Sequence, residues 1–201
     1  MSTRTAARQY WVAVRAMLIL TVVLGVGYTA VITGIGQAAL PAQANGSLVE
    51  VDVEAVGSRL IGQSYSDEGG AALPEWFQSR PSAAGDGYDG GASSGSNYGP
   101  ESEELLALVE EREAAIVELE GVDRREIPAD ALTASASGLD PHISSAYALL
   151  QVDRVAEARG LAEARVRSLV EEHTRGRALG YLGEETVNVL ELNIALAELK
   201  G

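Results

Sequence analysis

The sequence contains no cysteine and only two histidines, His142 and His173. Without cysteine the chain can form no disulfide, no thiolate nucleophile and no cysteine-ligated zinc site. Neither histidine has a His or Glu companion four residues further along, the spacing that places two metal ligands on one helix face. Neither histidine lies in a sequence motif typical of enzymes with an activated serine nucleophile. We therefore expect no catalytic residue and no metal site in this chain.

Acidic residues are absent from the first 40 positions, which carry Arg4, Arg8 and Arg15. The whole chain has 15 basic and 29 acidic residues, so residues 41–201 retain 12 basic against 29 acidic residues, a net charge of −17. Such an acidic chain cannot neutralise a run of phosphates, which argues against nucleic acid as a partner. The acidic part would concentrate cations near its surface, although solubility alone would also account for the charge.

A long uncharged segment follows the arginines, because no charged residue occurs between positions 16 and 49. Its apolar part, residues 16–35, spans roughly 30 Å as a helix, the thickness of a bilayer core. Tyr10 and Trp11 precede it, where aromatic side chains lie at a membrane surface. The arginines on the N-terminal side favour the cytoplasm for that end. We predict a cytoplasmic N-terminus at 1–9, a transmembrane helix at 10–36, a linker at 37–46 and an extracytoplasmic domain at 47–201.

A cleaved signal peptide is the alternative interpretation of the same segment. A basic region precedes the apolar run, and residues 42–44 read A-Q-A, an A-x-A cleavage pattern. The apolar run is longer than a typical signal-peptide core, and the A-Q-A lies well beyond its end, so the uncleaved anchor is favoured. Both interpretations place residues 41–201 outside the cell.

Small residues recur every four positions along the predicted membrane helix, at Thr21, Gly25, Thr29 and Thr33. Small side chains at this spacing allow another helix to approach closely, which predicts an interface with a partner subunit. Glycine and threonine are also common in membrane helices in general, so the alternative that this pattern marks no interface stays open.

The outer domain begins with two predicted strands, at 48–53 and 57–65, followed by a short extended piece at 76–83. Residues 84–100 form a glycine-rich loop by composition. This loop contains a GxGxxG spacing, but Asp86 and Asp89 inside it would repel a pyrophosphate and no helix follows directly, so we reject a dinucleotide site.

Helical periodicity dominates after Pro100. Gly121 should end the first helix, Asp140 should cap the next with Pro141 at its first position, and Asp153 should cap a further turn. The last helix is predicted at roughly 185–199. The sum is an α+β fold, in which one transmembrane helix precedes a small sheet and several helices.

Six strings of the outer domain occur in a definite order: GSRLIGQ (57–63), RPSA (80–83), SGSNYGP (94–100), IPADALTASASGLDPHIS (127–144), QVDRVAEARGL (151–161) and GYLGEETVNVLELNIAL (180–196). With the single membrane helix, they closely resemble the KdpC family, the small subunit of the Kdp potassium-transporting P-type ATPase. The resemblance covers nearly the whole chain.

The resemblance implies a non-catalytic subunit that stabilises a high-affinity potassium uptake complex in the cell membrane. Its partners would be a channel-like potassium-binding subunit, a P-type ATPase subunit and membrane lipid. The family is also described as a catalytic chaperone that raises ATP affinity, which makes Gln151 a candidate nucleotide contact and ATP a possible ligand, with no cofactor bound firmly. Asp140, Pro141 and His142 are candidate interface residues. The alternative is an anchored or secreted binding or hydrolytic domain unrelated to transport.

Overall fold

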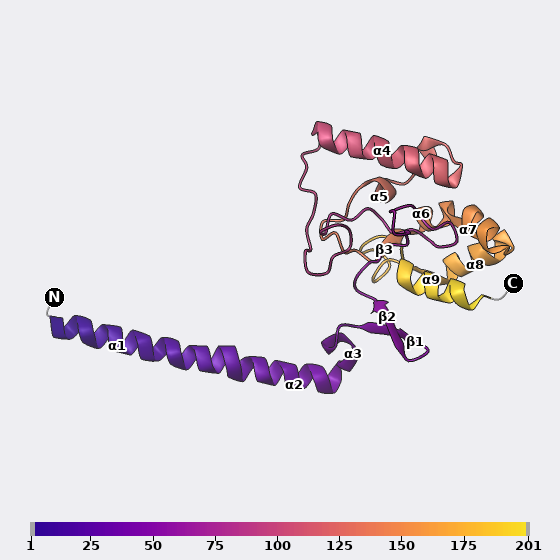
Figure 1. Ribbon diagram of the computed structural model, residues 1–201. Helices are drawn as coiled ribbons and strands as arrows, with labels where there is room; N and C mark the ends of the chain where they lie inside the picture. Colours follow the sequence, from indigo (N-terminus) through magenta and orange to yellow (C-terminus); the bar gives the residue numbers. More distant parts are fainter. Residues whose placement is uncertain (1–2, 200–201) are drawn as a thin grey trace. The chain divides into compact units, whose positions relative to one another are not determined.

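The computed structural model describes residues 3–199. The chain divides into two compact units between Leu48 and Val49, and each is described by itself. Helix covers nearly all of the first unit, with α1 at Thr3–Leu20, the π-helix η1 at Thr21–Tyr28, α2 at Thr29–Ala39 and the short α3 at Pro41–Ala44 (Figure 1). The stretch Arg4–Ala39 is long and apolar enough to cross a membrane. The helix thus extends beyond the predicted 10–36 at both ends.

The first helical run stops at Leu40, whose backbone leaves the helical region (φ −137°, ψ 54°). Pro41 follows directly, and a residue that precedes proline is pushed away from the helical conformation. Part of the predicted 37–46 linker is therefore helical, since α3 starts at the same proline.

A hairpin of β1 (Leu48–Val51) and β2 (Glu54–Ser58) begins at the boundary between the units, with all but Leu48 in the second. Asp52 and Val53 join the strands with φ of 50° and 71°, the positive values of a two-residue type I′ turn. The predicted strand at 48–53 therefore ends two residues early. The strand predicted at 57–65 was largely wrong, because Ser58 starts a turn by accepting from the N–H of Leu60 with its hydroxyl.

A second sheet holds the centre of this unit, with the strand order β3-β5-β4 and antiparallel pairing throughout. Its strands are short and lie between the helices in sequence: β3 is His142–Ser144, β4 is Thr174–Arg175 and β5 is Thr186–Asn188. The sequence patterns predicted none of them. The α+β class is confirmed, but the strands of this sheet lie in the C-terminal part of the sequence rather than before the helices.

The helices of the second unit surround this sheet (Figure 1). They are α4 (Glu103–Glu120), η2 (Arg124–Glu126), α5 (Ala129–Leu132), α6 (Ser145–Leu150), α7 (Val152–Arg159), α8 (Glu163–His173) and α9 (Val189–Glu198). Gly121 ends α4 in the left-handed region, as predicted (φ 69°). The fully buried core includes Phe77, Ile143, Val166, Leu192 and Leu196.

Two of the predicted helix starts were wrong. Asp140 and Pro141 precede a strand rather than a helix, and Ser144 caps α6 by accepting from the Tyr147 N–H at 3.0 Å. The strand forms because Ile143 pairs with Val187 of β5, a contact 44 residues away that outweighs the local helix signal. Asp153 lies inside the first turn of α7, whose N-cap is Gln151.

Candidate functional site

Among residues 3–199 the structure brings together no group of three or more His, Asp or Glu side chains that could hold a metal ion. The glycine-rich loop contains a G-x-S-x-G spacing at 91–95, yet the segment is irregular and not the strand-to-helix turn of a nucleophile elbow. Ser93 at its centre donates its hydroxyl hydrogen to the Ser137 carbonyl at 2.9 Å.

The segment TASASGLDPHIS (133–144) is built against the glycine-rich loop. Gly138 takes φ 69°, and a Cβ there would lie 2.6 Å from the Ser94 carbonyl oxygen and 2.7 Å from the Ala84 nitrogen. The Ser94 N–H donates to the Ser137 carbonyl at 3.0 Å. Only glycine fits this crossing, which explains why two loops of small residues lie side by side.

Asp140 forms the polar centre of this segment. One carboxylate oxygen accepts from Arg80 at 3.1 Å, and the other accepts from the His142 N–H at 3.0 Å and lies 3.3 Å from the His142 ring nitrogen. Burial would raise the pKa of Asp140, but hydrogen bonds from His142 and the charge of Arg80 outweigh it, so the pKa lies below its usual value. Arg80 also donates to the Thr133 carbonyl at 3.2 Å.

The three interface residues predicted in this segment have different environments. Pro141 is buried, and its carbonyl accepts from the Val189 N–H at 3.0 Å. The carboxylate of Asp140 is occupied by Arg80 and His142. The side chains of His142 and Asp140 are similarly exposed, at 32% and 31%.

Tyr88 supports the same cluster from the glycine-rich loop. Its hydroxyl donates to the Arg80 carbonyl. Burial raises the pKa of Tyr88 to about 12, and the charge of Asp140 adds to this effect, while a hydrogen bond with Ser79 and the charge of Arg80 oppose it. The phenol is therefore neutral and acts as a fixed donor.

Gln151, the candidate nucleotide contact, is fully buried with 0% exposure. Its side-chain oxygen accepts from the Gln78 N–H at 2.6 Å and from Arg154 at 2.8 Å. Its amide nitrogen donates to the Gln78 carbonyl at 3.2 Å. Both ends of the amide are thus bonded within the chain, and in this conformation the side chain presents no polar atom to a ligand.

Arg154 connects Gln151 to the end of α4. Its Nε lies 3.0 Å from the Glu120 carboxylate, and the two side chains are 7% and 1% exposed. Burial raises the pKa of Glu120, although the hydrogen bond and charge of Arg154 partly offset the rise. Arg154 also donates to the carbonyls of Pro74 and Trp76 at 2.5 and 3.0 Å.

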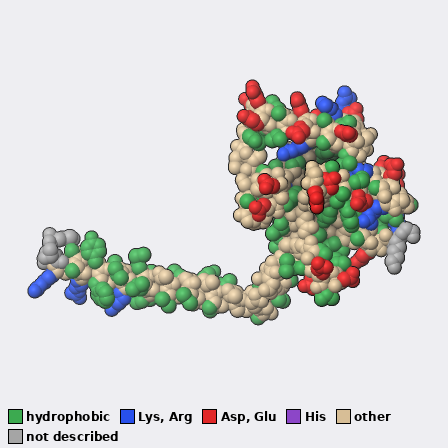
Figure 2. All heavy atoms as spheres, viewed as in Figure 1, with side chains coloured by type: hydrophobic (Ala, Val, Ile, Leu, Met, Phe, Trp, Pro, Cys, Tyr) green, Lys and Arg blue, Asp and Glu red, His purple; other side chains and the backbone are tan. Residues whose placement is uncertain are grey.

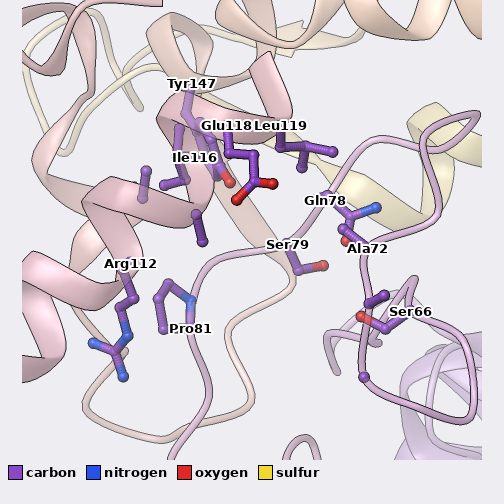
Figure 3. A pocket seen from close by; sticks show the side chains of 14 residues that line it. Ser66, Ala72, Gln78, Ser79, Pro81, Arg112, Ile116, Glu118, Leu119 and Tyr147 are labelled. Carbon is purple, nitrogen blue, oxygen red and sulfur yellow. The ribbon is translucent and has the colours of Figure 1, made fainter. Parts of the chain in front are cut away.

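A hollow of about 730 Å³ lies where α4 faces the chain around residues 66–81 (Figure 3). Ile116 and Leu119 of α4 line it with Tyr147 of α6, and Arg112 and Glu118 contribute charge. Ser79 and Pro81 line the opposite side. Gln78, Ser79 and Pro81 therefore form part of the wall of this hollow, which we call the α4 groove.

Sequence reasoning missed the residues that bond to Asp140 and Gln151, which are Arg80, Gln78 and Arg154. It also missed Tyr88, Glu120 and Asn193, which bond in turn to Arg80, Arg154 and Phe77. Most of these pairs join residues far apart in the sequence, by 116 positions for Phe77 and Asn193, so no local pattern predicts them. One local signal was available, because the polar Asn193 interrupts the apolar face of the last helix.

The small residues of the predicted membrane helix are exposed, as are nearly all the other described residues of this helix. Thr21 and Gly25 fall in η1, and a Cβ on Gly25 would lie 3.9 Å from the Thr21 methyl carbon. Thr29 and Thr33 continue in α2, and all four residues are exposed. A π-helix turn is wider than an α-helix turn, because each hydrogen bond reaches one residue farther. In space-filling view this segment is apolar along its length, with arginines near its N-terminal end, while acidic side chains gather on the second unit (Figure 2).

Comparison with known proteins covers both units. The sequence model of the family described as "KdpC: K+-transporting ATPase, c chain" matches residues 10–198. A potassium-transporting ATPase KdpC subunit of Kineococcus radiotolerans is 55% identical over 189 residues, covering 94% of this chain and 93% of the relative. The KdpC subunit of Mycobacterium tuberculosis H37Rv is 47% identical, covering 96% of this chain and 99% of the relative. That of Ralstonia nicotianae is 51% identical, covering 90% and 86%. These matches do not favour an unrelated binding or hydrolytic domain.

Proposed function

Because the chain belongs to the KdpC family, the c chains of K⁺-transporting ATPases, we propose that it is a non-catalytic, membrane-anchored subunit that holds the other subunits together. Those subunits would be a channel-like potassium-binding protein and a P-type subunit that hydrolyses ATP. The observation that carries the proposal is the family match over residues 10–198, which includes the membrane helix and the outer domain alike.

Two exposed features support a role in assembly. Thr21, Gly25, Thr29 and Thr33 are exposed, and their small side chains let another membrane helix approach closely. At the hairpin tips of the second unit, Val53 is 94% exposed and Leu179 is 81% exposed, which makes them available to other subunits. In this proposal the arginines keep the N-terminus in the cytoplasm, and the acidic domain lies outside.

The same subunit would also raise the ATP affinity of the hydrolysing subunit. Gln151 is sealed inside its own domain, so a direct bond to nucleotide would first require it to leave Gln78 and Arg154. We therefore propose that any effect on ATP affinity passes through contacts between subunits.

Co-purification tests the assembly proposal. A C-terminal tag on the chain should recover a channel-like protein and a P-type ATPase from membranes in mild detergent, with potassium-stimulated ATP hydrolysis in the eluate. Gly25→Leu should lower partner recovery about fivefold, equivalent to ~1 kcal/mol of helix packing. Val23→Leu, two positions away on the same helix, is the matched control. Recovery of the chain alone, or equal recovery with both variants, would contradict the proposal.

A further inference from the structure

The segment 74–78, which we call the strap, is held by the side chains of other elements and is buried at its last two residues. It consists of turns and irregular backbone, yet Phe77 is 0% exposed and Gln78 is 9% exposed. Buried backbone N–H and C=O groups require hydrogen-bond partners, and this strap has no neighbouring strand to supply them.

Two amide side chains form the hydrogen bonds that a neighbouring strand would otherwise supply. Asn193 of α9 accepts from the Phe77 N–H at 3.0 Å and donates to the Phe77 carbonyl at 3.0 Å. Gln151 does the same for Gln78, at 2.6 and 3.2 Å. Each amide thus pairs with both polar groups of one residue, the pattern that an antiparallel strand neighbour gives.

The remaining carbonyls of the strap are held by arginines. Arg154 donates to the carbonyls of Pro74 and Trp76, and Arg159 donates to the carbonyl of Glu75 at 2.9 Å. The Arg159 guanidinium also lies 4.5 Å from the centre of the Trp76 ring. The strap is therefore fixed from α7 and α9 and, through the Arg154–Glu120 pair, from the end of α4.

The fixed strap leads directly into residues 79–81, which line two hollows of the surface. Ser79 and Pro81 face the α4 groove (Figure 3) and also line a smaller polar hollow of about 270 Å³. If the strap moved, the walls of both hollows would change shape. Because Arg154 also pairs with Glu120, the same movement would affect the end of α4.

We propose that Gln151 and Asn193 are positioning residues that together lock the 74–78 strap and thereby set the α4 groove. Each amide acts on one strap residue: Asn193 on Phe77, and Gln151 on Gln78. Gln151 acts through the strap, and its role needs no contact with nucleotide.

Hydrogen exchange tests the lock residue by residue, in the full-length chain within the detergent-extracted membrane complex. The N–H groups of Phe77 and Gln78 should be protected in the native chain despite their irregular backbone. Asn193→Leu should speed exchange at Phe77 by roughly tenfold, and Gln151→Leu should do so at Gln78. Glu184→Gln, an exposed change, should leave both rates as they are.

Conservative variants keep the test usable where the leucine variants do not fold. Gln151→Glu and Asn193→Asp keep the acceptor oxygen and lose the donor, so exchange rates should lie between those of the native chain and the leucine variants. Fast exchange at Gln78 in the native chain, or rates unchanged by Gln151→Leu or Gln151→Glu, would overturn the lock.

The ATP concentration for half-maximal hydrolysis by the complex separates positioning from nucleotide contact. If the lock acts as a unit, Gln151→Leu and Asn193→Leu should shift this concentration in the same direction and by similar factors, with protection elsewhere in the core retained. A shift with Gln151→Leu alone would overturn the inference. Because exchange is read at amides of this chain and assembly is read from partner recovery, a failure of the lock is distinguishable from a failure to assemble with partners.

Discussion

The Nε atom of Arg154 lies 3.0 Å from both carboxylate oxygens of Glu120, in a pair almost completely shielded from water. Two ions in such a place are held by their partners, because each would lose its hydration without compensation if left alone. Arg154 carries the larger share of bonds, since it also reaches Pro74, Trp76 and Gln151.

Breaking this pair should strongly destabilise the fold. Arg154→Met leaves Glu120 buried and unpaired and should lower the free energy of unfolding by about 3–5 kcal/mol. Glu120→Gln keeps an acceptor for the arginine and should lower it less, by about 1–2 kcal/mol. Urea unfolding of the full-length chain in detergent, followed by Trp76 fluorescence in a Trp11→Phe background, measures both. Equal losses in the two variants would contradict the unequal roles.

Asp140 should make stability depend on pH in the acidic range. Its pKa is lowered in the folded chain, so the stability it contributes is present above its ordinary value of 3.8 and is lost as pH falls through the lower folded value. Asp140→Asn should lower the free energy of unfolding by about 1 kcal/mol at pH 7, a modest amount because solvent screens a partly exposed carboxylate. The two unfolding curves should converge below pH 3.8. A difference that persists unchanged at pH 2 would refute this assignment.

Gly138 should tolerate no side chain. Gly138→Ala places a Cβ against the Ser94 carbonyl and the Ala84 nitrogen at a positive φ, so we expect a loss of about 3 kcal/mol or more in the free energy of unfolding. Gly160→Ala is the matched control, because its φ is 64° and no atom lies within 4 Å of the new Cβ. That control should lose only about 1 kcal/mol from backbone strain. Similar losses at both sites would show that the loop crossing is not tight.

Ser144 should matter as the cap of α6. Its hydroxyl accepts from the Tyr147 N–H and donates to Asp130 at 2.8 Å, while Asp130 also accepts from the Ser144 N–H at 2.7 Å. Ser144→Ala should lower the free energy of unfolding by about 1–2 kcal/mol. Ser145→Ala, one residue further along, should change it little. If Ser145→Ala had the larger effect, the helix would begin elsewhere than at Ser145.

The exposed pair Arg177–Glu184 provides a reference for all these measurements. Its side chains are 47% and 78% exposed, and solvent screens their attraction. Glu184→Gln should leave the urea midpoint nearly unchanged, and a large shift there would show that the assay reports surface charge rather than core packing.

Local signals predicted the elements whose causes are local. The helix of the first unit follows from an uncharged apolar run, and α4 follows from apolar periodicity and a terminal glycine at Gly121. Gly138 takes a positive φ, a conformation that glycine adopts without steric cost. The family resemblance was likewise readable, because long strings occur in order along the chain.

Elements that depend on distant partners were missed or placed wrongly. A strand at His142–Ser144 exists only because β5 pairs with it, so the local pattern of Asp140 and Pro141 pointed to a helix. Gln151 illustrates the same limit at the level of a side chain. In the sequence it is a glutamine beside a helix start, whereas in the structure it is buried and its amide pairs with the backbone of Gln78, 73 residues earlier.

The sequence by itself therefore determined the long apolar helix, the acidic character of the second unit, the α+β class and the family, since each rests on composition, periodicity or continuous strings. Tertiary structure alone decided how the central sheet pairs, how Asp140 joins Arg80 to His142, and how Gln151 and Asn193 hold the strap. The physical reason is that hydrogen bonds and buried charges are satisfied by whichever group the folded chain brings near, and that proximity leaves no trace in local spacing.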